Sequence, residues 1–158
     1  EAFAKIAAQY PQWKLIIVGG GEEEKRLRTL IVQHNLKTQV FLPGASSNTK
    51  EYLNRASIYV TSSRVEGFPN ALLEAMAAGV PPISFDFSCG PRDIIDHQKN
   101  GLLVRANDIE KLAESMAYLI ENGAMREILG QNAEKVREIY SLQNIAERWK
   151  DILQMVKK

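Results

Sequence analysis

The sequence has few of the residues that form disulfides or hold structural metals. Among its 158 residues there is one cysteine, Cys89, and there are two histidines, His34 and His97. A lone cysteine cannot form a disulfide within the chain, and three such residues are too few for a zinc cluster. The small domain must therefore be stabilised by its apolar core. This composition fits a reducing, cytosolic compartment.

An excess of one charge and a long apolar run are missing too. Lysine and arginine number 20 against 19 acidic residues, which gives a formal net charge of +1. That balance gives no strongly basic face for nucleic acid, so we expect no nucleic-acid partner. The uncharged stretch 75–85 is too short to cross a bilayer and is interrupted by glycine and proline. We therefore expect no membrane span in this segment.

What is present is typical of one ordinary globular domain, residues 1–158. Apolar residues make up 45% of the chain and charged residues 25%, which excludes disordered and low-complexity classes. A chain of this length can bury roughly 70% of the surface that it exposes when unfolded.

Short apolar runs alternate with helical patterns over the first 105 residues. This order predicts an α/β fold, a Rossmann-like parallel sheet with helices on both faces. The predicted strands are 14–18, 39–42, 57–61, 82–85 and 102–104. The predicted helices between them are 22–34, 49–54, 69–78 and 92–96. Ligands of such folds bind beyond the carboxyl ends of the strands, so we expect loops 19–22, 42–48, 62–70 and 86–92 to share one edge.

Helical patterns also mark both ends of the chain. The first residues follow helical spacing up to Pro11, without a capping residue before them, so we interpret the domain as truncated at its N-terminus. The last helix, 141–158, carries an apolar stripe that includes Ile145, Trp149 and Ile152. We expect this stripe to pack in the core or on a separate N-terminal domain.

The first candidate binding feature is the glycine turn Gly19-Gly20-Gly21 between a strand and a helix. Glycines there let backbone amides approach a phosphate at the helix start. A dinucleotide fingerprint would need glycine where Glu24 stands, and Glu22 would repel a pyrophosphate. A simple tight turn with acidic first-turn residues explains the pattern equally well.

The most informative segment is 63–79, which holds two glutamates separated by seven residues. Glu66 lies in the loop before a predicted helix, and Glu74 lies within that helix. The unpaired amides at the helix start, between the two acids, suit a phosphate, and each carboxylate can accept hydrogen bonds from a diol. A nucleotide sugar presents hydroxyls, diphosphate and ribose hydroxyls in this order. Two surface acids on a buried helix are the simpler alternative, but Gly67-Phe68-Pro69 between them disfavours it.

The segment 63–79 resembles the signature of the family-4 retaining glycosyltransferases, which have a B-type fold of two facing Rossmann-like domains. The segments 89–95 and 100–104 resemble the next block of that family, and 18–21 and 41–44 resemble earlier ones. The likeness runs from Glu1 to Trp149. It implies that this chain is the C-terminal, donor-nucleotide-binding domain.

The resemblance assigns a role to each residue of the expected site. Glu66 contacts the donor sugar at the reacting centre and is the catalytic residue, and Glu74 binds the ribose. The donor sugar is bound by Glu66, Gly67, Phe68, Pro69 and Asn70. The nucleotide is bound by Glu74, Leu72, Leu73, Gly20, Val40 and Leu42. It implies no metal and no cofactor, because helix-start amides and basic side chains neutralise the diphosphate.

The expected reaction is the transfer of a hexose or N-acetylhexosamine from a UDP-sugar to an acceptor hydroxyl, with retention. The context implied by the resemblance is surface polysaccharide or lipopolysaccharide synthesis in the cytoplasm, at the inner face of the membrane. The glycan or lipid-linked acceptor would bind the missing N-terminal domain. This domain alone is expected to be inactive. The family's arginine and lysine for the diphosphate lie upstream of Glu1, and Asp93 stands where many members have glutamate.

Some alternatives stay open at this point. The same fold serves nucleotide-sugar epimerases and glycogen or starch synthases, and the domain could also be a non-catalytic nucleotide-binding module. A hydride-transferring enzyme is disfavoured by the absent glycine fingerprint. Arg92 could face the donor site or form a surface ion pair. His97 could pair with Asp96 for catalysis, although a solvated loop histidine is the simpler interpretation.

Overall fold

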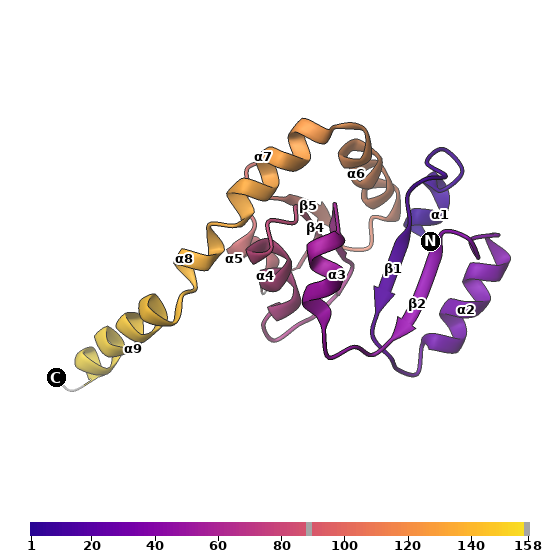
Figure 1. The fold of residues 1–158 in the computed structure, drawn as a ribbon. Coiled ribbons are helices and arrows are strands. Elements are labelled where there is room, and N and C mark those ends of the chain that lie inside the picture. Colours follow the sequence, from indigo (N-terminus) through magenta and orange to yellow (C-terminus); the bar gives the residue numbers. More distant parts are fainter. Residues whose placement is uncertain (88–89, 157–158) are drawn as a thin grey trace.

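The computed structural model describes residues 1–87 and 90–156. Cys89, together with the start of the 89–95 block, lies outside the described residues. Figure 1 shows a body of strands and helices from which the C-terminal helix extends. No helix in the described ranges is both long and apolar enough to cross a membrane.

The five strands form where the apolar runs predict them. They are β1 (Leu15–Val18), β2 (Val40–Gly44), β3 (Tyr59–Thr61), β4 (Pro82–Asp86) and β5 (Leu102–Arg105). Every pairing is parallel, so the predicted α/β class is confirmed. The strands belong to two sheets, however, one of β1 and β2 and one in the order β3-β4-β5.

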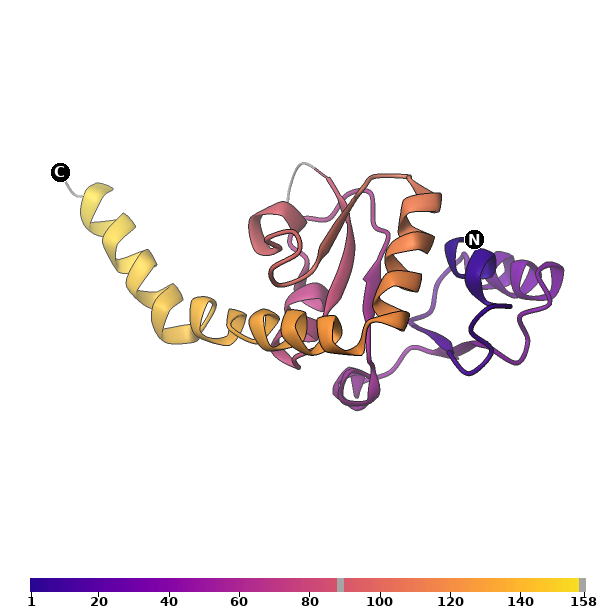
Figure 2. The same ribbon diagram turned by 90° about the horizontal axis from the view of Figure 1, so that it is seen from above.

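Helices connect and cover these strands. They are α1 (Ala2–Ile6), α2 (Glu24–Gln33), α3 (Thr49–Arg55), α4 (Asn70–Ala77), α5 (Pro91–Ile94), α6 (Ile109–Glu121), α7 (Gly123–Ala133), α8 (Val136–Ile139) and α9 (Leu142–Val156). On the three-stranded sheet, α6 packs on one face and α4 and α5 on the other, as Figure 2 shows from above. Helix α1 ends at Ile6 rather than at Pro11, and turns lead from it to β1.

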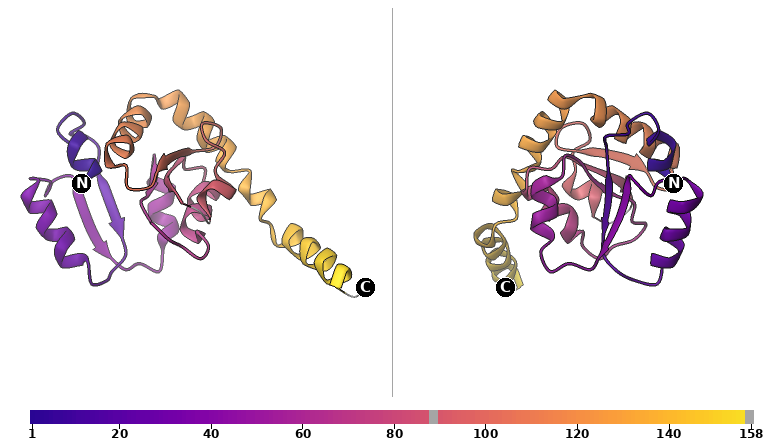
Figure 3. Two further views of the ribbon diagram at one scale, coloured as in Figure 1. Left: turned by 180° about the vertical axis from the view of Figure 1, so that it is seen from behind. Right: turned by 45° about the vertical axis from the view of Figure 1, so that its right-hand side comes forward.

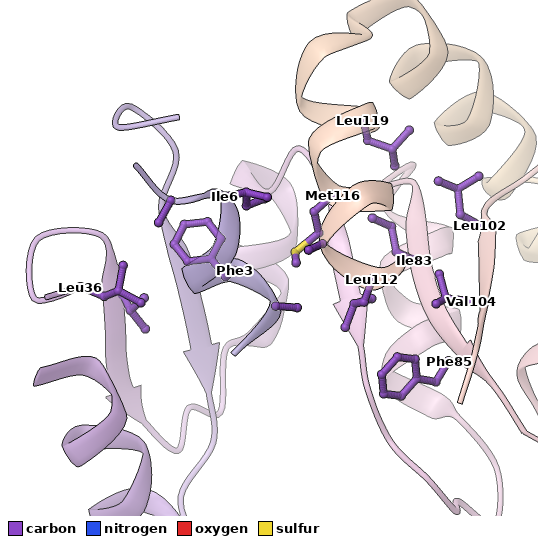
Figure 4. Packing of buried hydrophobic residues seen from close by; sticks show 14 of the residues in the cluster. Phe3, Ile6, Leu36, Ile83, Phe85, Leu102, Val104, Leu112, Met116 and Leu119 are labelled. Atoms are coloured by element: carbon purple, nitrogen blue, oxygen red, sulfur yellow. The ribbon is translucent and has the colours of Figure 1, made fainter. Parts of the chain in front are cut away.

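The larger core cluster connects the two sheets on one side. Phe3 and Ile6 of α1 lie on the same side as Met116 of α6, and Ile83 of β4 packs beneath α6 (Figure 4). The alternating strand positions direct Ile83 to this cluster and the next residue of β4 to the opposite face. The core therefore forms one apolar layer that touches both sheets.

The second cluster holds α4 in place from the other side. Leu72 and Met76 of α4 are fully buried together with Ala133 and Val136 of the C-terminal helices. At Gly130 a side chain would overlap the carbonyl oxygen of Gly79, so α7 lies directly against the turn after α4. Helix α4 is therefore fixed along its length by burial.

Helix α9 extends away from this body, as the view from behind shows (Figure 3, left). Trp149 is 60% exposed, and Ile152 and Leu153 are exposed as well. The expectation that this stripe belongs to a core is therefore wrong for the described residues. The alternative, packing on another domain, stays a prediction.

Candidate functional site

The start of α4 lies at the carboxyl edge of the three-stranded sheet, after the loop that follows β3. Pro69 caps the helix and is buried, which fixes where the helix begins. The amide of Asn70 donates to the Phe68 carbonyl at 3.0 Å, and that of Leu73 donates to Pro69 at 3.1 Å. The amides of residues 71–72 have no backbone acceptor among the described residues. They are the free donors of the helix start.

This pattern changes the expected contribution of two leucines. The Leu72 side chain is only 1% exposed, so Leu72 can offer a ligand its backbone amide and nothing else. The Leu73 amide is already used inside the helix. The backbone donors that α4 leaves free are therefore the amides of Ala71 and Leu72, at the positive end of the helix dipole.

The two glutamates lie on the same side of the molecule as this helix start. Burial, followed by the negative charge of Glu66, raises the pKa of the Tyr59 hydroxyl to about 12, and the charge of Glu74 also raises it. A hydrogen bond with Thr61 acts in the opposite direction. Since one hydroxyl senses both carboxylates, Glu66 and Glu74 both lie near Tyr59. Within the described ranges, neither acid forms an ion pair.

The loop after β4 meets the start of α4. A side chain at Gly90 would bring its Cβ to 3.1 Å from Cδ of Pro69, and Gly90 has φ of +117°. The two loops therefore pack closely only because position 90 is glycine. This contact places the start of α5 beside the helix tip of α4, as expected for two loops at one edge.

Arg92 in α5 is held by its own loop. Its Nε donates to Oδ1 of Asp86 at 2.9 Å, and about half of the arginine side chain remains exposed. Of the two interpretations, the structure shows the surface ion pair. The guanidinium has further N–H donors that this ion pair does not use.

The glycine turn lies at the carboxyl end of β1 next to the loop after β2. The Gly19 amide donates to the Gly44 carbonyl at 2.9 Å, and Gly20 lies near the Ala45 amide. The acids that follow form ion pairs within α2, Glu23 with Arg26 at 2.8 Å and Glu24 with Arg28 at 2.7 Å. The glycine turn is thus bonded to the loop after β2 at this edge, and arginines of α2 neutralise two of the acids that follow it.

The structure supports the expected nucleotide contacts of β2 unequally. Val40 is the first residue of β2 and is only 7% exposed in the core, at the opposite end of the strand from the carboxyl edge. This position gives no support to its assignment as a nucleotide-binding residue, which stays a prediction. Leu42 is half-buried in the middle of the strand, and the residues at the edge are Gly44 and Ala45.

Two tyrosines near the site were missed. Tyr59 points from β3 to the α4 side, and the alternation of the predicted strand places residue 59 on the face opposite Val60. Tyr140, after α8, lies edge-on to Phe68 with ring centroids 6.3 Å apart. No local signal in the sequence connects residues 72 positions apart.

The other candidate, His97, does not form a catalytic pair. Its Nδ1 accepts a hydrogen bond from the Leu103 amide at 3.0 Å, at the edge of β5. Asp96 instead bonds to Lys99 at 2.7 Å. Across residues 1–87 and 90–156, no cluster of three or more metal-binding side chains occurs.

Parallel strands, helices on both sides and loops gathered at the carboxyl edge define a Rossmann-like domain of nucleotide-dependent proteins. The match to the family described as "Glycosyl transferases group 1" covers residues 1–136. The chain belongs to this group 1 glycosyltransferase family. Its fold is that of the C-terminal domain of GT-B glycosyltransferases.

Individual proteins agree with this assignment. The chain is 39% identical over 153 residues to an exopolysaccharide phosphotransferase of Streptomyces coelicolor, covering 96% of this chain but 16% of that protein. It is 28% identical to Staphylococcus aureus TarM, crystallised as a variant with Fondaparinux, alpha-GlcNAc-glycerol and UDP. The TM-score is 0.90, and the alignment covers 95% of this chain and 31% of TarM.

A third match is itself a single domain. The crystal structure of the C-terminal domain of LpcC, a group 1 glycosyltransferase of Francisella tularensis, gives a TM-score of 0.79 at 26% identity, covering 88% of this chain and 75% of that one. The chain spans less than half of the length of the first curated relatives that it matches.

Proposed function

We propose that this chain is the donor-nucleotide-binding domain of a retaining glycosyltransferase of family 4, and that its donor is a UDP-sugar. The observation that carries the proposal is that Glu66, in the loop before α4, and Glu74, within α4, both act on the Tyr59 hydroxyl, next to a helix start whose amides at 71–72 have no backbone acceptor in the described residues. The UDP in the TarM structure supports the choice of nucleotide.

Each part of the site then has one task. The amides of Ala71 and Leu72 bind the diphosphate with the helix dipole. Glu74 accepts hydrogen bonds from the ribose hydroxyls, and Glu66 accepts them from the sugar. The segment 67–70 supplies backbone contacts to the sugar, and Gly20 borders the nucleotide from the glycine turn.

The reaction breaks the bond between the anomeric carbon and the diphosphate oxygen, and a bond from that carbon to the acceptor oxygen forms. The electron pair of the broken bond leaves with the diphosphate oxygen of UDP, and this oxygen takes up the proton that the acceptor hydroxyl loses. Helix-start amides stabilise the charge that develops on the diphosphate, while Glu66 stabilises positive charge on the sugar ring. This division of work requires neither a metal nor a cofactor.

The acceptor side belongs to the rest of the protein. We propose a growing glycan or a lipid-linked saccharide in surface polysaccharide synthesis, in keeping with the name of the Streptomyces relative. The acceptor would bind an N-terminal domain, on which the exposed stripe of α9 packs. The complete enzyme would work in the cytoplasm at the inner face of the membrane.

Isothermal titration of the 158-residue chain with UDP, GDP and NAD tests the proposed donor. UDP should bind, weakly, because half of the cleft is not part of this chain, and GDP and NAD should bind at least tenfold more weakly. Equal affinities for all three would overturn the choice of UDP, and no heat with UDP at millimolar concentration would overturn the nucleotide site.

A second measurement tests the division into two domains. The purified chain with a UDP-sugar and an acceptor glycan should release no UDP above the rate of spontaneous hydrolysis. Sustained UDP release by these residues alone would show that the catalytic site is complete within them.

A further inference from the structure

One short helix contacts α4 near both of its ends. Helix α8 lies beside α4 and leads into α9 (Figure 1). Nε of Arg137 in α8 donates to the carbonyl of Ala77, the last residue of α4, at 2.5 Å. Tyr140, directly after α8, packs its ring on Phe68, before the start of α4. Residues 137–140 thus connect the end of α4 with the loop before its start.

We propose that Tyr140 is a positioning residue for the loop 64–69, which we call the Glu66 loop. The ring of Tyr140 fixes Phe68, and Phe68 in turn sets where the loop presents the carboxylate of Glu66. The proposed function makes this loop the sugar-binding loop, so a role of Tyr140 in sugar transfer rests on that function. Its role in ordering the loop does not.

The Glu66 loop has little support of its own. Val65 is 86% exposed and Phe68 is 53% exposed. Beyond its chain neighbours, a Cβ on Gly67 would meet no described atom within 4 Å, so the backbone beside Glu66 borders open space. Before the loop, the hydroxyl of Ser63 accepts a hydrogen bond from the end of β3 at 3.3 Å. The position of the loop therefore depends on its two anchored ends.

The anchor at the α4 end has two parts. The Phe68 carbonyl accepts the Asn70 amide at 3.0 Å, which ties the backbone of the loop to the first residue of α4. The Phe68 ring meets the Tyr140 ring edge-on, with the centroids 6.3 Å apart and the planes at 62°. Such an arrangement is favoured for aromatic pairs and stabilises them beyond the burial of apolar area. Without the Tyr140 ring, only the backbone part of this anchor would remain as described.

Tyr140 is itself held firmly along the chain. Its amide donates to the carbonyl of Val136 at 2.9 Å, and Val136 is buried in the second cluster with Leu72 of α4. On the other side, Nδ2 of Asn144 in α9 donates to the Glu138 carbonyl at 2.6 Å, which braces the joint between α8 and α9. Because the backbone on both sides of Tyr140 is fixed, its ring can hold a mobile neighbour in place.

A tyrosine that only fills the core would behave differently. Tyr140 also packs against the second cluster, so its removal lowers the stability of the domain in either case. Positioning requires in addition that the effect on the loop pass through Phe68. Because the contact is made between the two rings, phenylalanine at position 140 should replace tyrosine.

Amide hydrogen exchange of the 158-residue chain, followed by NMR without any nucleotide, tests the positioning of the loop. The Asn70 amide reports on the loop because its acceptor is the Phe68 carbonyl. Tyr140→Ala should speed its exchange roughly two- to tenfold, as expected for the loss of one aromatic pair. The Val80 amide, bonded to Ala75 near the other end of α4, should exchange at an unchanged rate. If Tyr140→Ala does not fold, Tyr140→Leu, which keeps an apolar side chain without the ring, should give the same result.

Three further variants separate positioning from core filling. Tyr140→Phe keeps the ring and should leave the exchange rate of Asn70 unchanged. Tyr118→Ala, which removes an exposed tyrosine of α6, should leave it unchanged as well. In a Phe68→Ala background, Tyr140→Ala should have no further effect on Asn70, because the contact is already lost. An equal increase at Asn70 and Val80, or an increase that persists in the Phe68→Ala background, would overturn the proposal.

Kinetics of the complete enzyme test the consequence for sugar transfer. Tyr140→Ala should lower kcat roughly two- to tenfold and leave the Kd for UDP unchanged, because the loop carries Glu66 and not the nucleotide-binding amides. Tyr140→Phe should restore kcat. Normal turnover of Tyr140→Ala, despite faster exchange at Asn70, would overturn its role in transfer. If UDP does not bind the unsubstituted protein, the proposed function fails, while the exchange rates still decide the role of Tyr140 in the loop.

Discussion

Two strand–loop–helix units of this domain present acids beside a helix start, and they use them differently. After β1, Glu23 and Glu24 form ion pairs with Arg26 and Arg28 on the same helix. After β3, Glu66 and Glu74 have no such partner in the described residues, and both act on the hydroxyl of the half-buried Tyr59.

The two helices that follow these loops, α2 and α4, differ in burial. No residue of α2 is buried, whereas Leu72, Ala75 and Met76 fix α4 against the sheet and the C-terminal helices. Acids with a partner on an exposed helix serve solubility and helix stability. Acids without one, at the tip of an immobilised helix, can accept hydrogen bonds from a ligand at a defined position. The comparison therefore distinguishes the loop after β3, which is the candidate binding loop, from the similar loop after β1.

The largest expected effect is the loss of turnover when Glu66 is substituted. In the complete enzyme, Glu66→Gln should lower kcat roughly 100- to 1,000-fold because it removes a charge that stabilises the transition state. Affinity for UDP should be unchanged, as measured by titration. Glu23→Gln is the control and should retain full turnover. A normal kcat for Glu66→Gln would remove this residue from catalysis.

The next difference concerns Glu74. Glu74→Ala should weaken UDP binding by about 1.5–3 kcal/mol, the contribution of a hydrogen bond to a charged group. Calorimetry would record this as a roughly 10- to 100-fold higher Kd. Glu24→Ala, which removes a paired acid of α2, should leave the Kd unchanged. If the two variants bind UDP equally well, Glu74 does not contact the ribose.

Tyr59 allows a smaller effect to be measured on the 158-residue chain. Its pKa is raised from 10.0 to about 12 in the folded state, so folding favours the protonated hydroxyl. This contribution is present below pH 10 and is lost as the pH rises from about 10 to 12. The free energy of unfolding should fall by roughly 1–2 kcal/mol over this range, allowing for partial exposure. Tyr59→Phe should lose this part of the pH dependence.

The smallest effects sharpen the comparison most directly. Glu66→Gln and Glu74→Gln should each lower the pKa of Tyr59, because each removes a nearby negative charge. Absorbance of tyrosinate at high pH, with Tyr59→Phe subtracted, measures the change. Glu23→Gln should leave this titration curve in place. A shift with Glu23→Gln as large as with Glu66→Gln would contradict the separation of the two units.

The sequence predicted the strands because their apolar runs are continuous. Residues 82–85 are all buried, and residues 102–104 are buried or half-buried, so both faces of these strands favour a continuous run over a strict alternation of apolar and polar residues. The helix at 69–78 was equally clear, since Pro69 begins it and Gly79 ends it. Local chemistry decides these elements, so local patterns reveal them.

Other features depend on contacts that local patterns do not contain. A single continuous sheet was expected, but the strands of the described residues form two sheets, and sheet membership depends on contacts between distant segments. Val40 was placed at the ligand edge because its strand borders it, whereas the direction of the strand puts it at the far end. The effect of Glu66 and Glu74 on Tyr59 depends on three-dimensional distance. The sequence spacing suggested the two acids but not the hydroxyl on which both act.

The close packing at Gly130 has a consequence for how variation in this domain should be interpreted. Even the methyl group of alanine at this position would overlap the Gly79 carbonyl, although Gly130 lies behind α4 and touches no ligand-binding loop. In a saturation mutagenesis screen for activity, substitutions at Gly130 would therefore be tolerated as poorly as substitutions at Glu66. Only soluble yield would distinguish the two positions, because substitutions at Gly130 lower it and substitutions at Glu66 leave it unchanged.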